Sequence, residues 1–434
     1  MKRINIITVV PFVLVILLPP ISTASKDSDK KSEDSKAASE FVELEMANAP
    51  DDAVTNLENK GISLEMVYTG ELVSNLSGGV KRRSEYLENG DILLSIDAEK
   101  LLSWKGASFS FYGLGNNGGD PSENIGDAQS TSNIESPNTW KIYEAWYRQK
   151  LFDGKLSYLI GLYDLNSEFD VIKYAGLFLN SSFGIGPDFS QSGENGPSIF
   201  PATSIALRVK VQPLEGFYVQ SAVFDGVSGD PEDPTGTSIK INSGDGILLS
   251  TEVAYVTGAA EDSKEAYGKL ALGTWFYTAK FDDLLQVDNN SVPVRHSGNR
   301  GIYALGERVI YRETDDLDQG VAIFARVGFA NGNFNQFGSY FGGGFVTTGL
   351  IPGLNKEQIG LAIAIATNSG KFKEARSAAS IPVGSSEIAL ELTFRSQILP
   401  HLVIQPDFQY IINPGTDPLL KNAFVVGTRF ELSL

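Results

Sequence analysis

From Ile62 to its C-terminus the chain repeats one pattern, in which apolar residues alternate with small, polar or charged ones. In one such run, Ile205 and Leu207 share one parity, whereas Arg208 and Lys210 share the other. Similar runs occupy residues 92–98, 156–162, 247–255, 321–329, 359–365, 388–395 and 424–434. Because successive side chains of a strand point to opposite faces, the pattern predicts many strands, each with one apolar and one polar face.

Alternation alone does not say which face is wet. A soluble sandwich buries its apolar faces, whereas a membrane barrel turns them to lipid and turns its charges to the lumen. The strands approach the roughly 9–11 residues that cross a bilayer. Short turns such as 153–154 alternate with long polar loops such as 116–138. Aromatic residues near strand ends would form an interfacial girdle; they are Tyr68, Tyr163, Tyr255, Tyr311 and Phe430. We therefore predict an all-β fold, a transmembrane antiparallel β-barrel with short periplasmic turns and long extracellular loops.

Composition excludes several other classes. The 434 residues include no cysteine, which rules out disulfides and thiolate chemistry. A closed barrel stabilises such an exported chain, because it pairs every strand edge. After the N-terminus no run approaches the roughly 18–20 apolar residues of a membrane-spanning helix. The formal net charge of −18 argues against nucleic acid as a partner.

The N-terminus reads as an export signal. Lys2 and Arg3 precede an apolar stretch, and small residues near Ala24 offer a cleavage site. We assign residues 1–24 to a signal peptide, 25–60 to a flexible acidic leader with a short helix at 51–60, and 61–434 to the barrel. The bacterial outer membrane is the expected location, with its lipid as a partner.

Several segments together resemble the carbohydrate-selective porin family, the OprB-type porins. They cover most of residues 61–434 in order and spacing: GDAQSTSNIE at 126–135, YEAWYRQKLFDGKLS at 143–157, LNSSFG at 179–184, VFDG at 223–226, GDGILL at 244–249, QPDFQYIINPG at 405–415 and AFVVG at 423–427. The resemblance implies a barrel of about 16 strands, inward-folded extracellular loops, passive diffusion of mono- and oligosaccharides, and a possible homotrimer. The acidic leader and the non-aromatic C-terminal Leu434 depart from the family pattern.

One strand offers a plausible sugar contact. Glu144, Trp146 and Arg148 share a face, which we expect to be lumenal because Glu and Arg facing lipid cost a few kcal/mol. Trp146 would then be an aromatic step between two charged groups. The alternative is that Trp146 belongs to the girdle and the two charges pair to stabilise the wall.

The same parity argument places other charged residues on the lumenal wall. They are Asp97, Arg208, Glu252, Arg308, Arg312, Arg326, Glu391 and Arg395. Arg208, Glu391 and Arg395 should face water, and Leu207, Leu392 and Phe394 lipid. Glu307 is ambiguous, because it shares parity with apolar residues. The loop acids Asp282 and Asp283, and those within 315–318, lack the pattern of a calcium loop, so we expect no metal and no cofactor.

The sequence disfavours an enzyme. Only two histidines occur, His296 and His401, and neither a Gly-x-Ser-x-Gly elbow nor a phosphate loop nor a His-Glu-x-x-His motif is present. The alternatives to a sugar-selective porin are a general non-selective porin, a soluble extracellular carbohydrate-binding β-protein, and a barrel lipase with a Ser–His pair.

Overall fold

The structure, a computed structural model, describes residues 57–259, 263, 265–313, 319–349 and 356–433. By contacts the chain divides into two units, residues 1–63 and 64–434. The signal peptide predicted for 1–24 and most of the leader predicted for 25–60 lie outside the described residues. Of the helix predicted for 51–60, residues 57–60 are described; 57–59 are helical, residue 60 is in a turn, and Gly61 follows with a φ of 87°.

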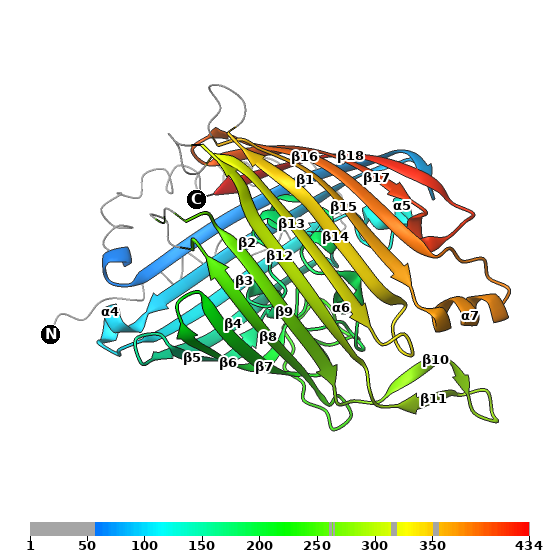
Figure 1. Cartoon of the computed structure of the whole chain (residues 1–434), viewed down its shortest axis with the longest axis horizontal. Coiled ribbons are helices and arrows are strands. Elements are labelled where there is room, and N and C mark those ends of the chain that lie inside the picture. Colours follow the sequence, from blue (N-terminus) through cyan, green and yellow to red (C-terminus); the bar gives the residue numbers. More distant parts are fainter. Residues whose placement is uncertain (1–56, 260–262, 264, 314–318, 350–355, 434) are drawn as a thin grey trace, which may run out of the picture. The chain divides into compact units, whose positions relative to one another are not determined.

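Sixteen strands close into one antiparallel barrel, as the sequence predicts (Figure 1). They are β1 (Ile62–Gly79), β2 (Ser84–Asp97), β3 (Ala107–Gly118), β4 (Thr139–Leu151), β5 (Leu156–Tyr163), β6 (Ser204–Leu214), β7 (Phe217–Asp225), β8 (Ile247–Thr257), β9 (Gly268–Tyr277), β12 (Arg300–Arg312), β13 (Gly320–Ala330), β14 (Phe337–Thr348), β15 (Gln358–Asn368), β16 (Ser386–Leu399), β17 (Leu402–Ile412) and β18 (Lys421–Ser433). Pairing of β1 with β18 leaves the sheet without a free edge.

The connections differ between the two ends of the barrel. At one end, the turn rim, they are mostly short: 98–106 with α4 (Ala98–Leu102), 152–155, 215–216 and 400–401. At the other end, the loop rim, they include 119–138 with α5 (Pro121–Ile125), 164–203, 226–246, 278–299 and 369–385 with α7 (Gly370–Ala378). The asymmetry predicted from the sequence is present. Within the described residues, no helix has the length and apolarity to cross a membrane.

The outer face of the barrel carries the apolar parity. Leu207 of β6 and Leu392 of β16 are nearly half exposed, while their neighbours Arg208 and Glu391 point inward and are buried. Near the turn rim, outward rings of Trp104, Phe109 and Tyr147 lie with centroids 5.2–6.0 Å apart. Such a cluster suits a membrane interface.

The predicted girdle is right only in part. Tyr255 and Tyr311 are more than half exposed, as a girdle requires. Tyr163, however, is buried and stacks on Phe224 with centroids 5.9 Å apart. The assignment of Tyr163 to the girdle is therefore wrong, because its parity is that of the buried Leu159 on the inner face of β5.

A two-stranded hairpin, β10 (Phe281–Val287) with β11 (Pro293–His296), stands at the loop rim beside α7 (Figure 1). Asp283 joins them: its Oδ2 lies 2.6 Å from Lys371 Nζ of α7 and 3.0 Å from His296 Nε2. Burial alone would raise the pKa of Asp283, but the Lys371 contact and the other hydrogen bonds outweigh burial and hold that pKa below its usual range.

Candidate functional site

The lumen is largely occupied by residues 164–203, which we call the inner segment. It includes η2 (Leu165–Ser167), η3 (Tyr174–Leu177), η4 (Ser181–Phe183) and α6 (Pro187–Ser190). Its aromatic side chains pack on inward side chains of the wall: Phe178 lies 5.6 Å from Phe324, and Phe189 stacks on Trp275 at 5.0 Å. The inward folding that the family resemblance implies is thus present, and it gives this barrel an apolar core.

Glutamates of the wall anchor this segment by accepting its backbone N–H groups. Glu144 accepts from Asp164 N at 2.7 Å, and Glu252 accepts from Asp170 N at 2.9 Å. Glu391 accepts from Leu179 N at 2.6 Å and from Asn180 N at 3.0 Å. Glu144, Glu252 and Glu391 therefore point inward as predicted, but all three are buried. The prediction that Glu391 faces water is wrong, because the inner segment covers it.

Two predicted lumenal arginines are buried in the same way. Arg326 lies between the rings of Tyr303 and Tyr340, at 5.4 and 5.2 Å, and donates to Asp170 and Asp188 of the inner segment, each at 2.7 Å. Arg208 pairs with Glu168 of that segment at 2.6 Å and donates to Ser157 Oγ at 2.7 Å. Both guanidinium groups hold the inner segment in place, so the expectation that Arg208 faces water is also wrong.

Strand β12 reverses the predicted faces. Glu307 points inward and accepts from Lys173 N at 3.0 Å and from Tyr174 N at 3.1 Å. Arg308 lies on the opposite, exposed face, so its placement on the lumenal wall is wrong. The parity rule failed here because the inner face of β12 carries the apolar core: Tyr303 on that face lies 6.3 Å from Phe189.

Three further predicted wall residues lie toward the turn rim. Asp97 ends β2 and caps α4, accepting from Glu99 N and Lys100 N at 3.0 and 3.1 Å, so it is a helix cap and not a mid-wall residue. Arg312, beyond a register shift in β12, donates to Ser263 O at 3.3 Å. Arg395 is partly exposed and pairs with Glu431 at 2.5 Å.

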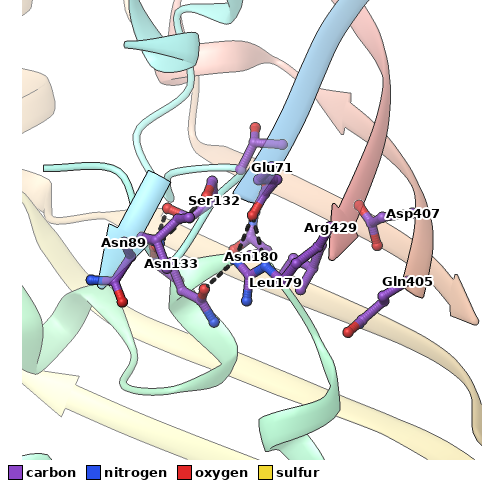
Figure 2. A network of polar contacts seen from close by, with 12 residues as sticks. Glu71, Asn89, Ser132, Asn133, Leu179, Asn180, Gln405, Asp407 and Arg429 are labelled. Atoms are coloured by element: carbon purple, nitrogen blue, oxygen red, sulfur yellow. Dashed lines mark hydrogen bonds and ion pairs between the residues drawn. The ribbon is translucent and has the colours of Figure 1, made fainter. Parts of the chain in front are cut away.

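A second stretch, residues 127–134 of the loop between β3 and β4, joins the inner segment. Ser181 N donates to Ser130 O at 2.9 Å, and Asn133 N donates to Leu179 O at 2.7 Å. We call residues 127–134 and 177–184 together the diaphragm. Figure 2 shows its contact with the wall, where Arg429 Nη2 reaches Asn133 Oδ1 at 2.7 Å while its Nε donates to Glu71 at 2.8 Å.

Cavities remain on both sides of the diaphragm. The vestibule, about 480 Å³ on the loop side, is lined by Asn89, Asp91, Tyr112, Asn133, Glu135 and Asn166 among others. The chamber, about 260 Å³ on the turn side, is lined by Lys173, Gln358, Arg395, Gln405, Arg429 and Glu431 among others. Of these, sequence reasoning singled out Arg395 alone. Arg429 and Glu431 carried a usable signal, since they alternate with apolar residues in the last strand.

The vestibule carries less negative charge than its residue types suggest. Burial, together with nearby Asp120 and Asp127, raises the pKa of Glu135 from 4.5 to about 9. Its carboxyl oxygens contact the Ser122 backbone N and hydroxyl at 3.1 and 2.9 Å. At neutral pH Glu135 is therefore protonated. The vestibule is a polar surface suited to hydroxyl groups.

The predicted trio on β4 forms one connected row. Trp146 Nε1 donates to Glu144 Oε2 at 3.3 Å, and the Arg148 guanidinium lies 5.3 Å from the Trp146 ring centre. Arg148 Nε also donates to Ser108 Oγ of β3 at 3.3 Å. Trp146 and Arg148 stay partly exposed, whereas Glu144 is buried beneath the start of the inner segment. The structure thus gives the trio two functions: Glu144 anchors, and the other two remain accessible.

The described residues contain no group of three or more His, Asp or Glu side chains arranged to hold a metal ion. Asp282 pairs with Arg295 at 3.1 Å, and Asp283 belongs to the α7 contact. The acids within 315–318 lie outside the described residues. His296 packs on Phe334 with ring centres 4.6 Å apart and contacts Asp283.

Comparison with known proteins agrees with this architecture. A family model described as the carbohydrate-selective porin, OprB family, matches residues 81–434. Porin B of Pseudomonas aeruginosa is 26% identical over 410 residues, covering 87% of this chain and 88% of that protein. A putative porin, QuiX, of Acinetobacter baylyi is 21% identical over 87% of this chain and 90% of its own length.

A solved structure supports the fold. The high-pH structure of Pseudomonas putida OprB has a TM-score of 0.78 at 22% identity, covering 88% of this chain and 96% of that one. The family model spans nearly all of the barrel, and the barrel carries the inward-folded loops expected of a pore that selects its solutes. The chain belongs to the OprB family of carbohydrate-selective porins, and it is a channel that lets carbohydrates diffuse passively across the outer membrane.

Proposed function

We propose that the diffusing sugar passes along the inner face of β2, β3 and β4, and that Trp146 is the surface on which its ring stacks. The inner segment and the diaphragm are tethered to the wall from β6 round to β18, through residues such as Arg208, Glu252, Glu391 and Arg429. On the β2–β4 side the contacts lie at their ends: Glu144 accepts from Asp164 N at 2.7 Å, and Asn116 donates to Ile134 O at 2.9 Å. On β2–β4, the inward side chains of Asp91, Tyr112, Trp146 and Arg148 stay partly exposed.

The observation that carries the proposal is the position of Trp146 between Glu144 and Arg148 on this wall. A sugar presents hydroxyls at its edge and weakly apolar faces, so an aromatic ring beside charged groups matches both. Transit also requires weak binding, because the sugar must leave again. A single partly exposed indole satisfies that requirement.

The test is sugar block of ion current in planar bilayers. We expect Trp146→Ala to leave conductance unchanged or higher and to weaken sugar block by about 1–2 kcal/mol, the scale of an aromatic contact, or roughly 5- to 30-fold in affinity. Trp104→Ala is the matched control, because Trp104 lies on the outer face near the turn rim. Unaltered block in a folded, conducting Trp146→Ala channel would assign Trp146 to the scaffold.

Two proposals concern the whole chain. We propose that residues 1–24 direct export and are removed, which N-terminal sequencing of the outer-membrane protein tests: an intact Met1 contradicts it. We also propose that the porin forms a homotrimer, as the family resemblance suggests. Chemical crosslinking in detergent should then give a trimeric band, and a monomer at every crosslinker concentration would contradict the proposal.

A further inference from the structure

The diaphragm is held by several contacts with β16 and β17, while on β3 Asn116 donates to Ile134 O at its end, at 2.9 Å. Glu391 of β16 accepts N–H groups from residues 179 and 180. Glu387, four residues earlier on the same face of β16, accepts from Ala128 N at 2.8 Å and Gln129 N at 3.0 Å. Gln409 of β17, opposite Glu391 in the register, donates to Thr131 O at 2.8 Å. Both halves of the diaphragm are thus bound to β16 and β17.

Glu387 and Glu391 depend on hydrogen bonds rather than on a cation among the described residues. Glu387 and Glu391 are fully buried, and among the described residues neither forms an ion pair. A buried carboxyl group costs free energy unless hydrogen bonds satisfy its oxygens. The diaphragm N–H groups supply such bonds to both glutamates, and Gly415 N donates a further one to Glu387 at 2.5 Å. The two carboxyl groups therefore favour one position of the diaphragm over positions in which these bonds are lost.

We propose that Glu387 and Glu391 are positioning residues that set the size limit of the pore. They hold the diaphragm against the β16–β17 wall, which fixes the width left beside β2–β4. The proposal rests on the sugar path proposed above. Neither glutamate contacts the sugar in this scheme; each acts through the backbone that it holds.

Replacement of Glu387 and Glu391 by glutamine tests whether their hydrogen bonds to the diaphragm matter, rather than the volume of their side chains. Glutamine has nearly the same volume, but one carboxylate oxygen becomes an NH₂ group, which cannot accept from a backbone N–H. In Glu391→Gln one of the two N–H groups at 179–180 therefore loses its acceptor and faces another donor. The diaphragm should leave the wall for part of the time.

The experiment compares swelling rates of proteoliposomes in glucose and in malto-oligosaccharides of increasing length. Glu391→Gln and Glu387→Gln/Glu391→Gln should admit longer oligosaccharides, with a several-fold rise in their rate relative to glucose and a fluctuating single-channel conductance. Glu357→Gln is the matched control: Glu357 is a buried carboxylate on the same side of the barrel whose described hydrogen bond goes to Ser396, at 3.2 Å, and not to the diaphragm. Heat-modifiable mobility on gels confirms that each variant is folded.

A crosslink between the diaphragm and the wall distinguishes release of the diaphragm from damage to the barrel. The side chains of Asn180 and Gln409 touch, at 3.2 Å, and the chain has no cysteine of its own. Oxidised Asn180→Cys/Gln409→Cys in the Glu391→Gln background should restore the size limit, and reduction should remove it again. A folded double glutamine variant with the wild-type size limit overturns the proposal, as does a widened limit that the crosslink does not restore. A different result would contradict the proposed sugar path: normal glucose permeation together with unaltered sugar block in Trp146→Ala.

Discussion

Arg326 holds the inner segment through two buried ion pairs. Its side chain is almost fully buried, as are the carboxylates of Asp170 and Asp188 that it contacts. Among the described residues, both acids form their ion pair with Arg326. Arg326→Met fills a similar volume but leaves two carboxylates buried without a cation. Removing one partner of a buried ion pair typically costs about 3–5 kcal/mol.

This loss should be local. The barrel strands keep their backbone ladders, so the cost falls on residues 165–190. Hydrogen exchange in detergent should show the amides of this stretch opening roughly 2.2 to 3.7 powers of ten more often than in the wild type, since each 1.36 kcal/mol is one power of ten. The amides of β2 and β3 should not change. Ion conductance should rise, because the inner segment no longer stays against the wall.

The pH dependence has a definite sign. Burial raises the pKa of Asp170 to about 6 even though Arg326 opposes that rise. When folding raises the pKa of a carboxyl group, its protonation stabilises the folded state. For Asp170 this stabilisation is complete at pH values below the unfolded-state pKa of 3.8, and it is lost as the pH rises through the folded-state pKa of about 6. Without Arg326 the folded pKa should rise further, so the deficit of Arg326→Met should shrink as the pH is lowered.

Two controls make the reasoning refutable. Arg83→Met removes a pair between an exposed arginine and the half-buried Glu85, and it should cost no more than about 1 kcal/mol. Arg326→Met combined with Asp170→Asn and Asp188→Asn should recover much of the protection, because the buried charges are gone. Protection of residues 165–190 at wild-type level in Arg326→Met, at pH 8, would show that apolar packing alone holds the inner segment.

The remaining predictions concern charge, faces and the loop rim. Raising the pH through about 9 should ionise Glu135 and increase cation selectivity, measured as reversal potential in a KCl gradient, and Glu135→Gln should abolish that change. Leu392→Cys should react with a lipid-soluble thiol reagent far faster than Glu391→Cys, since Leu392 is exposed on the outer face and Glu391 is covered; the reverse order would invert the face assignment. Lys371→Ala should free the β10–β11 hairpin from α7, seen as faster proteolysis within 281–296, whereas an unchanged cleavage rate would show that the apolar contacts of Phe281 and Phe334 suffice.

The sequence predicted the fold correctly where all the side chains on one face of a strand have the same surroundings. Across the bilayer the outer wall meets lipid throughout, so apolar residues such as Leu207 and Leu392 recur with period two and identify the strands. The turn-rim and loop-rim asymmetry follows from local composition in the same way. These signals are local, so the sequence of a single strand or loop is enough to recognise them.

The inner wall has no uniform solvent, and parity alone therefore could not describe it. The side chain of Glu391 meets a backbone more than 200 residues away, and Tyr303 meets the ring of Phe189. Whether an inward charge meets water, a counter-ion or an amide depends on where the inner segment lies, and its own composition does not fix that position. Several wall charges that seemed to line a path instead hold the structure that shapes it: Glu252 and Glu391 accept N–H groups of the inner segment, and Arg208 and Arg326 pair with its carboxylates. Solute selection in such a pore is then a property of how firmly the lumen is filled, and mutations at buried wall charges should alter it as strongly as mutations at the accessible Trp146.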